Sequence, residues 1–360
     1  MLKQIVAVFA IFLGASATTT AQAATAQASC ALPAIAASAE LQEIPASSLM
    51  TVPVEINGKP KRFLLDIGTG ATEISRATVK ELGLTQPIKH NEAYNSGATP
   101  QTFGPESSAG VGGQTFQFAV VDVNGAQAQE DSRPLVGIEN FTIGKATGHN
   151  LVFAVANSRE MGTAQPYDGL MTGSFFKQYD VELDFSGKKI SYLTPTACTD
   201  LGQVAFWPHA QVAAVPMTMS DGKITVQVTI RGRPMNAVID TSAAHTIMRR
   251  DIAERILGLK ADTPGMMPAD DLRDGQGTRV YRHVLPLVSF ADGIAAHDVP
   301  ALIQTNAMTY NPHREPILGS RATFKQDPLM PDLTLGMDVL RQLHLYVVYS
   351  QNSIYVTSAG

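Results

Sequence analysis

Residues 52–66 read VPVEINGKPKRFLLD, and residues 226–240 read VQVTIRGRPMNAVID. The two segments align without a gap at an offset of 174 residues, which places Asp66 opposite Asp240. Each segment alternates apolar and polar residues, turns at Gly-x-Pro and then runs through apolar residues into the aspartate. This pattern predicts a β-hairpin whose second strand is buried on both faces. The chain therefore contains a duplicated β-rich unit.

The duplication extends beyond the hairpins. A short helical pattern that ends in Leu-Gly-Leu follows each aspartate, at residues 79–84 and 253–259. The far ends also correspond, because residues 168–193 and 333–356 each lead through an apolar segment into two strand patterns joined by a polar turn. We expect an all-β fold of two homologous β-barrel lobes with short helices, related by a pseudo-two-fold axis. The expected units are a signal peptide at 1–23, a leader at 24–50, lobe 1 at 51–195, an interlobe linker at 196–216 and lobe 2 at 217–360.

The first segment is typical of a secretory signal peptide. Lys3 precedes an apolar run from Ile5 to Gly14, and small residues follow, ending at Ala21-Gln22-Ala23. The apolar run is about half as long as a membrane-spanning helix requires, so a permanent membrane span is not expected. The alternative is a buried N-terminal helix. The sequence thus predicts a secreted or periplasmic protein, which we expect to be a monomer.

Export would place Cys30 and Cys198 in an oxidising compartment, where an even number of cysteines favours pairing. The alternative is two unrelated buried thiols. We predict a Cys30–Cys198 disulfide that ties the leader to the start of the interlobe linker. The leader itself has little reason to be ordered alone.

The composition limits the classes of function. The chain has 360 residues, of which 44% are hydrophobic and 16% charged, so wholesale disorder is excluded. Lys and Arg number 27 against 32 Asp and Glu, which is not the basic excess of a nucleic-acid binder. Eight histidines form no close ligand cluster, and two cysteines are too few for a thiolate zinc site. We therefore expect no cofactor, no metal and no nucleic-acid partner.

An aspartate at the end of a buried strand is unusual, because desolvating a carboxylate is costly. A turn-capping role would explain one such residue but not its recurrence in both copies. A two-fold relation between the lobes would bring Asp66 and Asp240 together, where both carboxylates cannot ionise at once. Such a pair supplies one general base and one general acid, which can activate a water and protonate a leaving amine.

The segments DIGTGAT at 66–72 and DTSAAHT at 240–246, with the duplicated lobe around them, resemble the retropepsin-like aspartic proteases of bacteria in a single-chain, pepsin-like arrangement. The resemblance implies an aspartic endopeptidase with Asp66 and Asp240 as its catalytic pair. A peptide or unfolded protein would lie extended between the lobes, and no covalent intermediate would form. The resemblance also implies supporting loops at Gly68, Thr69, Thr241 and Ser242, with backbone N–H donors from Gly68 and Ser242, and a flap at Gly110, Gly112 and Gly113.

Three positions depart from the family pattern. Ile67 replaces the usual threonine, so only Thr241 can bond across to the loop of the other lobe. Ser242 replaces glycine, and its Cβ is expected to crowd the loops or strain their backbone. Ala243 offers Asp240 no hydroxyl, whereas Thr69 offers one to Asp66. The alternative function is therefore a catalytically weakened protease-like fold that only binds peptides or proteins.

Overall fold

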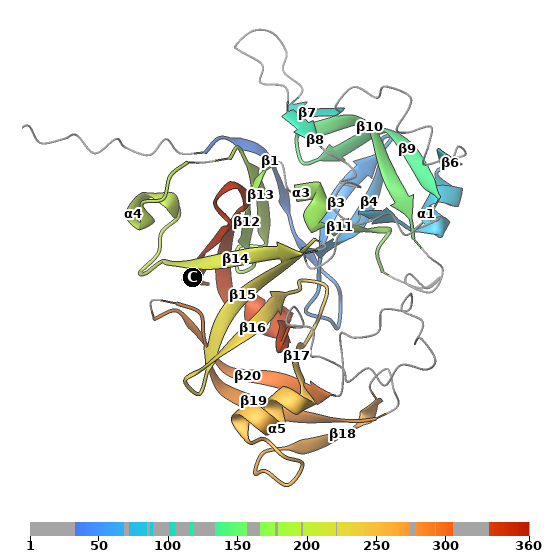
Figure 1. Cartoon of the computed structure of the whole chain (residues 1–360). Coiled ribbons are helices and arrows are strands. Elements are labelled where there is room, and N and C mark those ends of the chain that lie inside the picture. The colour runs from blue at the N-terminus through green and yellow to red at the C-terminus, as the bar shows by residue number, and fades with distance from the viewer. Residues whose placement is uncertain are drawn as a thin grey trace, which may run out of the picture.

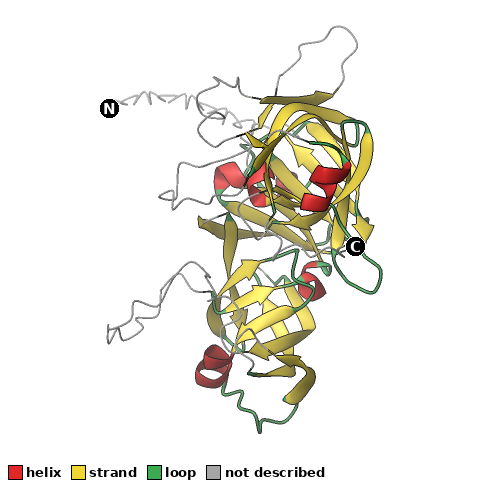
Figure 2. Cartoon of the chain, turned by 90° about the vertical axis from the view of Figure 1, so that its right-hand side faces the viewer, coloured by secondary structure: helices red, strands yellow, loops and turns green. Residues whose placement is uncertain are grey.

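The computed structural model contains two β-rich lobes and a sheet that joins them (Figure 1). Lobe 1 lies above lobe 2 in Figure 2, and the helices are short. The fold is therefore mostly β and two-lobed, as the sequence predicts. The residues described are 33–67, 72–84, 87–88, 101–105, 116–118, 134–156, 166–176, 179–195, 197–220, 222–273, 278–291, 293–304 and 331–359.

Lobe 1 is built on a ten-stranded sheet in the order β6-β9-β3-β4-β11-β5-β10-β7-β8, with β2 paired to β3. Its core holds the buried rings of Phe63, Phe141 and Phe153, whose centroids lie between 5.1 and 5.9 Å apart. Lobe 1 comprises β2 Gln42–Glu43, β3 Met50–Ile56, β4 Lys59–Asp66, β5 Glu73–Ile74, α1 Arg76–Glu81, β6 Pro87–Ile88, β7 Gln101–Pro105, β8 Phe116–Phe118, β9 Leu135–Ile143, β10 Ala146–Val155, β11 Gly169–Thr172 and α3 Gly173–Phe176.

Lobe 2 repeats the strand pairing of lobe 1. β16 pairs in parallel with β21 as β4 pairs with β11, and β17 pairs in parallel with β20 as β5 pairs with β10. The duplication read from the sequence is therefore a duplication of topology. Lobe 2 comprises β15 Lys223–Ile230, β16 Arg233–Ile239, β17 Thr246–Arg249, α5 Arg250–Leu257, β18 Met267–Arg273, β19 Arg279–Ser289, β20 Ala295–Gln304, β21 Leu333–Leu335 and α6 Met337–Leu340.

The repeated hairpins β3–β4 and β15–β16 turn in the same way. Asn57 and Gly58 have φ values of 50° and 75°, and Arg231 and Gly232 have φ values of 50° and 72°. Positive φ at both central residues gives the two-residue turn that matches the right-handed twist of the strands. Glycine takes up this conformation without the steric cost that a Cβ brings. The same local turn therefore sets the register of both strands that lead to the aspartates.

Six strands of a thirteen-stranded sheet join the lobes, in the order β1-β13-β12-β22-β23-β14. The last of them, β14, pairs with β15 of lobe 2. The lobes meet where β12 pairs antiparallel with β22, with Leu183 opposite Leu345. The joining sheet comprises β1 Ile35–Glu40, β12 Asp180–Asp184, β13 Lys189–Leu193, β14 Ala213–Ser220, β22 Leu343–Val348 and β23 Ser353–Ser358, with the one-turn helix η1 Tyr349–Gln351 before β23.

Part of the leader is ordered by pairing with a neighbouring strand. Residues Ile35–Glu40 form β1, which pairs with β13. Ala36, Ala37 and Ala39 are buried in the core. Small side chains carry a weak hydrophobic signal in the sequence, and it is the backbone pairing with β13 that orders the segment.

The interlobe linker packs on one face of the joining sheet. It contains α4 Leu201–Val204, and Trp207 stacks on His344 of β22 with ring centroids 4.1 Å apart. The indole N–H of Trp207 donates to Thr357 Oγ1 of β23 at 3.1 Å. The linker is therefore held by both strands that lobe 2 contributes at this face.

Two sequence predictions concern export. Cys198 is buried and is not a free thiol, whereas Cys30 lies outside the described residues, so their pairing stays a prediction. Residues 1–23 also lie outside the described part of the chain. Among the described helices, none has the length and apolar character needed to cross a bilayer.

Candidate active site

The two aspartates occupy equivalent places in the lobes. Asp66 is the last residue of β4, lies opposite Thr172 of β11 and is 2% exposed. Asp240 directly follows β16, is partly buried, and its N–H donates to Leu335 O of β21 at 3.1 Å. Both strands lie between two neighbours in their sheet, which explains the burial of their final residues. The carboxylates thus end two central strands.

Thr241 joins the two aspartate loops across the lobes. Its Oγ1 accepts a hydrogen bond from Ile67 N at 3.0 Å and donates to Leu65 O at 2.8 Å. Leu65 and Ile67 flank Asp66, and Thr241 is the neighbour of Asp240. The structure thus brings the backbone on both sides of Asp66 to the residue that follows Asp240. Ile67 has no hydroxyl to return the contact, and its side chain is buried in the core.

Ser242 supports Asp240 more fully than the sequence suggests. Asp240 Oδ1 accepts hydrogen bonds from Ser242 N at 2.9 Å, from Ser242 Oγ at 2.7 Å and from Ala243 N at 3.1 Å. The N–H bond matches the expected role of Ser242. Ala243 offers Asp240 no hydroxyl, as its sequence position implies, but Ser242 provides one. Ser242 is not among the described residues with positive φ, so its backbone carries no left-handed strain.

The buried carboxylate of Asp338 stabilises the aspartate loop of lobe 2. Asp338 of α6 accepts hydrogen bonds from Thr246 N, at 2.9 and 3.0 Å, and from Thr246 Oγ1, at 2.6 Å. Gly336 lies so close to this loop that an added Cβ would be 2.4 Å from the carbonyl of His245. In lobe 1, Thr72 and Thr172 share a hydrogen bond at 3.1 Å in the corresponding place.

Sequence reasoning missed three residues around the aspartates. Asp338 has no acidic counterpart in lobe 1, so the duplication did not reveal it. Ser48 donates to Ala244 O at 3.2 Å and adds a second contact between the lobes, for which the sequence carries no signal. The third residue is Tyr167. Burial and then the negative charge of Asp66 raise the pKa of its phenol, which indicates that Tyr167 lies near Asp66. Its position just before Asp168-Gly169, a segment that the duplication singles out, was the available signal.

Several predicted residues cannot be placed. Those at Gly68, Thr69, Gly110, Gly112 and Gly113 lie outside the described residues. Their roles beside Asp66 and in a flap stay predictions.

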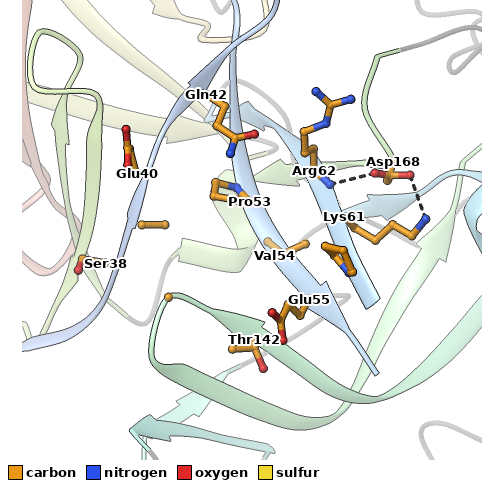
Figure 3. Close-up of a pocket in the computed structure, with 13 residues that line it drawn as sticks. Ser38, Glu40, Gln42, Pro53, Val54, Glu55, Lys61, Arg62, Thr142 and Asp168 are labelled. Atoms are coloured by element: carbon orange, nitrogen blue, oxygen red, sulfur yellow. Dashed lines mark hydrogen bonds and ion pairs between the residues drawn. The ribbon is translucent and has the colours of Figure 1, made fainter. Parts of the chain in front are cut away.

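A cavity of about 660 Å³ lies on lobe 1 away from the aspartates, between β1, β3 and β4 (Figure 3). Neither aspartate loop lines it. Lys61 is 8% exposed, and its Nζ lies 2.7 Å from Glu81 Oε1 and 3.6 Å from Asp168 Oδ1. The second carboxylate oxygen of Asp168 accepts from Arg62 N. These contacts compensate a nearly buried lysine, so we assign them a structural role.

One comparison with known proteins agrees with this geometry. A family model described as aspartyl protease matches residues 52–125 and 226–339, one region in each lobe. The search of curated proteins found no match. Two similar solved structures are conglutin gamma, a basic 7S globulin from lupine seeds, and basic 7S globulin from soybean. The first is 12% identical, with 89% of this chain and 94% of the other covered and a TM-score of 0.47. The second is 11% identical, with 91% and 96% covered and a TM-score of 0.45, and at such values neither supports a statement about activity.

Proposed function

Because the chain belongs to the aspartyl protease family, we propose that it is an exported aspartic endopeptidase that hydrolyses peptide bonds with a water activated by Asp66 and Asp240. The observation that carries the proposal is the pair of hydrogen bonds at Thr241 Oγ1, which accepts from Ile67 N and donates to Leu65 O on either side of Asp66. A family match alone is compatible with lobes whose aspartates stay apart. The contact of Thr241 with both neighbours of Asp66 supports the pairing of the two aspartate loops.

The chemistry follows from two carboxylates that share one proton. The ionised carboxylate takes a proton from the water as its oxygen attacks the scissile carbonyl carbon, and the protonated carboxyl donates to the carbonyl oxygen. The tetrahedral intermediate then collapses and the C–N bond breaks. The leaving nitrogen accepts the proton that the first carboxylate took from the water, and the second carboxylate recovers a proton from a hydroxyl of the intermediate. No group of the protein becomes covalently attached. The substrate is an extended polypeptide between the lobes, held through its backbone.

Export is supported by the signal-peptide pattern of residues 1–23 and by Cys198, which is not a free thiol. The second candidate function is a peptide-binding module without catalysis. The observation that favours it is Ile67, which leaves the contact between the aspartate loops one-sided.

The test is cleavage of a denatured protein by the mature chain from about pH 3 to pH 8, beside the variants Asp66→Asn and Asp240→Asn. A peptidase gives a bell-shaped profile on the acidic side of neutrality, because one carboxyl must be charged and the other protonated. Both variants should lose cleavage, and chelators should leave it unchanged. Binding of the substrate without cleavage at any pH would favour the binding module, and cleavage that survives in both variants would exclude the proposed pair.

A further inference from the structure

The two aspartate loops differ at two successive positions. The duplication aligns Gly68-Thr69 with Ser242-Ala243, so the residue with a hydroxyl and the residue without one have exchanged places. Considered separately, each change in the second loop is a loss: the serine removes a glycine, and the alanine removes a hydroxyl. Considered together, they move the hydroxyl one residue closer to the aspartate.

The structure shows where the moved hydroxyl goes. Ser242 Oγ lies 2.7 Å from Asp240 Oδ1, and the N–H groups of Ser242 and Ala243 reach the same oxygen at 2.9 and 3.1 Å. Three donors on one oxygen restrict rotation of the carboxylate about its last bond. In the described part of the chain, Asp240 Oδ2 accepts no hydrogen bond and is left for another partner.

A turn alone does not account for the serine. A backbone N–H bonded to the carboxylate of the aspartate two residues earlier already forms such a turn, and Ser242 N donates in this way. Ala243 N, three residues after Asp240, adds a second backbone bond. The hydroxyl adds a third bond, and its length is that expected of a hydroxyl bonded to a charged or strongly polar acceptor. The added bond therefore acts on the carboxylate and not on the path of the backbone.

We propose that Ser242 is a positioning residue, whose hydroxyl replaces the one that Ala243 lacks and holds Asp240 Oδ1 so that Oδ2 faces the reacting water. This proposal rests on the proposed peptidase function. It implies that the departures at Ser242 and Ala243 compensate each other. The second loop then reaches by a different residue the support that Thr69 is expected to give in the first.

The test moves the hydroxyl back. Ser242→Ala keeps the Cβ and the N–H and removes only the third bond, so kcat should fall about tenfold to a hundredfold with little change in KM. Ser242→Thr keeps the hydroxyl and should retain most of the activity. The double variant Ser242→Gly with Ala243→Thr recreates the Gly-Thr order of the first loop and should be more active than Ser242→Gly alone.

The chain offers a matched control. Ser186 Oγ donates to Asp184 Oδ1 at 3.1 Å, and Gly187 N donates to the same oxygen at 2.7 Å, in an exposed turn outside the site. Ser186→Ala removes the same kind of bond and should change neither kcat nor the pH profile. Wild-type kcat in Ser242→Ala would overturn the proposal. So would a double variant no better than Ser242→Gly.

Crystal structures separate this proposal from the proposed function. The Asp240 carboxylate should be rotated in Ser242→Ala and restored in Ser242→Thr. If the wild-type chain cleaves nothing, the peptidase proposal fails, and the crystal structures alone then decide the positioning role. An unrotated carboxylate in Ser242→Ala would overturn that role whether or not the wild-type chain is active.

Discussion

A single buried hydroxyl, that of Thr241, links the aspartate loops of the two lobes. It accepts from Ile67 N and donates to Leu65 O, and all three groups lie in the interior. A buried N–H or C=O that loses its partner costs free energy because no water replaces the bond. Ile67 occupies the place of Thr241 in the duplication and has no hydroxyl, so these two bonds depend on one residue.

We expect Thr241→Val to lower the free energy of unfolding by about 1–3 kcal/mol, because the variant keeps the shape and leaves a buried N–H and a buried C=O unpaired. It should also lower kcat, since the flanks of Asp66 lose their attachment to the second loop. Denaturant unfolding and kinetics measure the two effects. Thr241→Ser keeps the hydroxyl and should lose much less of both. Equal losses in the serine and valine variants would show that packing of the methyl group, not the hydroxyl, matters.

At the scale of elements, the strands β12 and β22 join the lobes through a side-chain contact as well as through backbone pairing. Glu182 of β12 and His344 of β22 are both nearly buried, and His344 Nε2 lies 3.2 Å from Glu182 Oε1. Burial by itself would raise the pKa of Glu182, but the hydrogen bond with His344 and the positive charges of His344 and Lys189 hold that pKa below its usual value. Trp207 stacks on the imidazole and shields the pair.

The lowered pKa of Glu182 predicts how stability depends on pH. A carboxyl whose pKa is lower in the folded chain stabilises the fold above its unfolded pKa, which is about 4.3, and this contribution is lost as the pH falls through the folded value. We expect Glu182→Gln to lower the free energy of unfolding by about 1–3 kcal/mol at neutral pH, and by progressively less as the pH falls below about 4.

Fluorescence of Trp207, the one tryptophan of the chain, is a direct measure of this unfolding. Glu139→Gln, on an exposed position of β9, is the matched control and should change stability little at any pH. A deficit in Glu182→Gln that stays constant from neutral to acidic pH would contradict the ionic role of this pair.

At the scale of the whole molecule, the chain reaches the joining sheet from both lobes and from the leader. β1 adds the leader to one edge next to β13, and the linker covers one face. Cys198 is buried in that covering layer, and its carbonyl accepts from Gln351 Nε2 at 2.9 Å. A disulfide between Cys198 and the leader would close a loop of chain that contains the whole of lobe 1.

We expect non-reducing mass spectrometry of the exported chain to find Cys30 linked to Cys198. Cys30→Ser, Cys198→Ser and the double variant should each lose about 2–4 kcal/mol of unfolding free energy, because each opens the same loop. Reduction should remove the same amount from the wild-type chain and nothing from the variants. Losses that add up in the double variant would show two independent buried thiols instead.

Most of the fold was predictable because its signals are local and occur twice. The alternation on β3 and β15, the glycine turns at Gly58 and Gly232, and the aspartates at the strand ends each depend on a few consecutive residues, and the duplication confirms each reading. The two lobes share one topology because the same sequence pattern occurs in both copies. The strand β1 was not predicted, because its alanines resemble those of an unstructured leader and only pairing with β13 orders them.

The sequence by itself therefore determined the two lobes, the strands that carry Asp66 and Asp240, and the dependence of the cross-lobe contact on Thr241. Only the tertiary structure decided that Ser242 turns its hydroxyl onto Asp240, that Asp338 braces Thr246, and that Glu182 meets His344. These contacts occur in one lobe only or join residues far apart in the chain, so the duplication cannot reveal them. Their geometry depends on side-chain directions that are set when the lobes pack, and a pattern of residue types does not contain those directions.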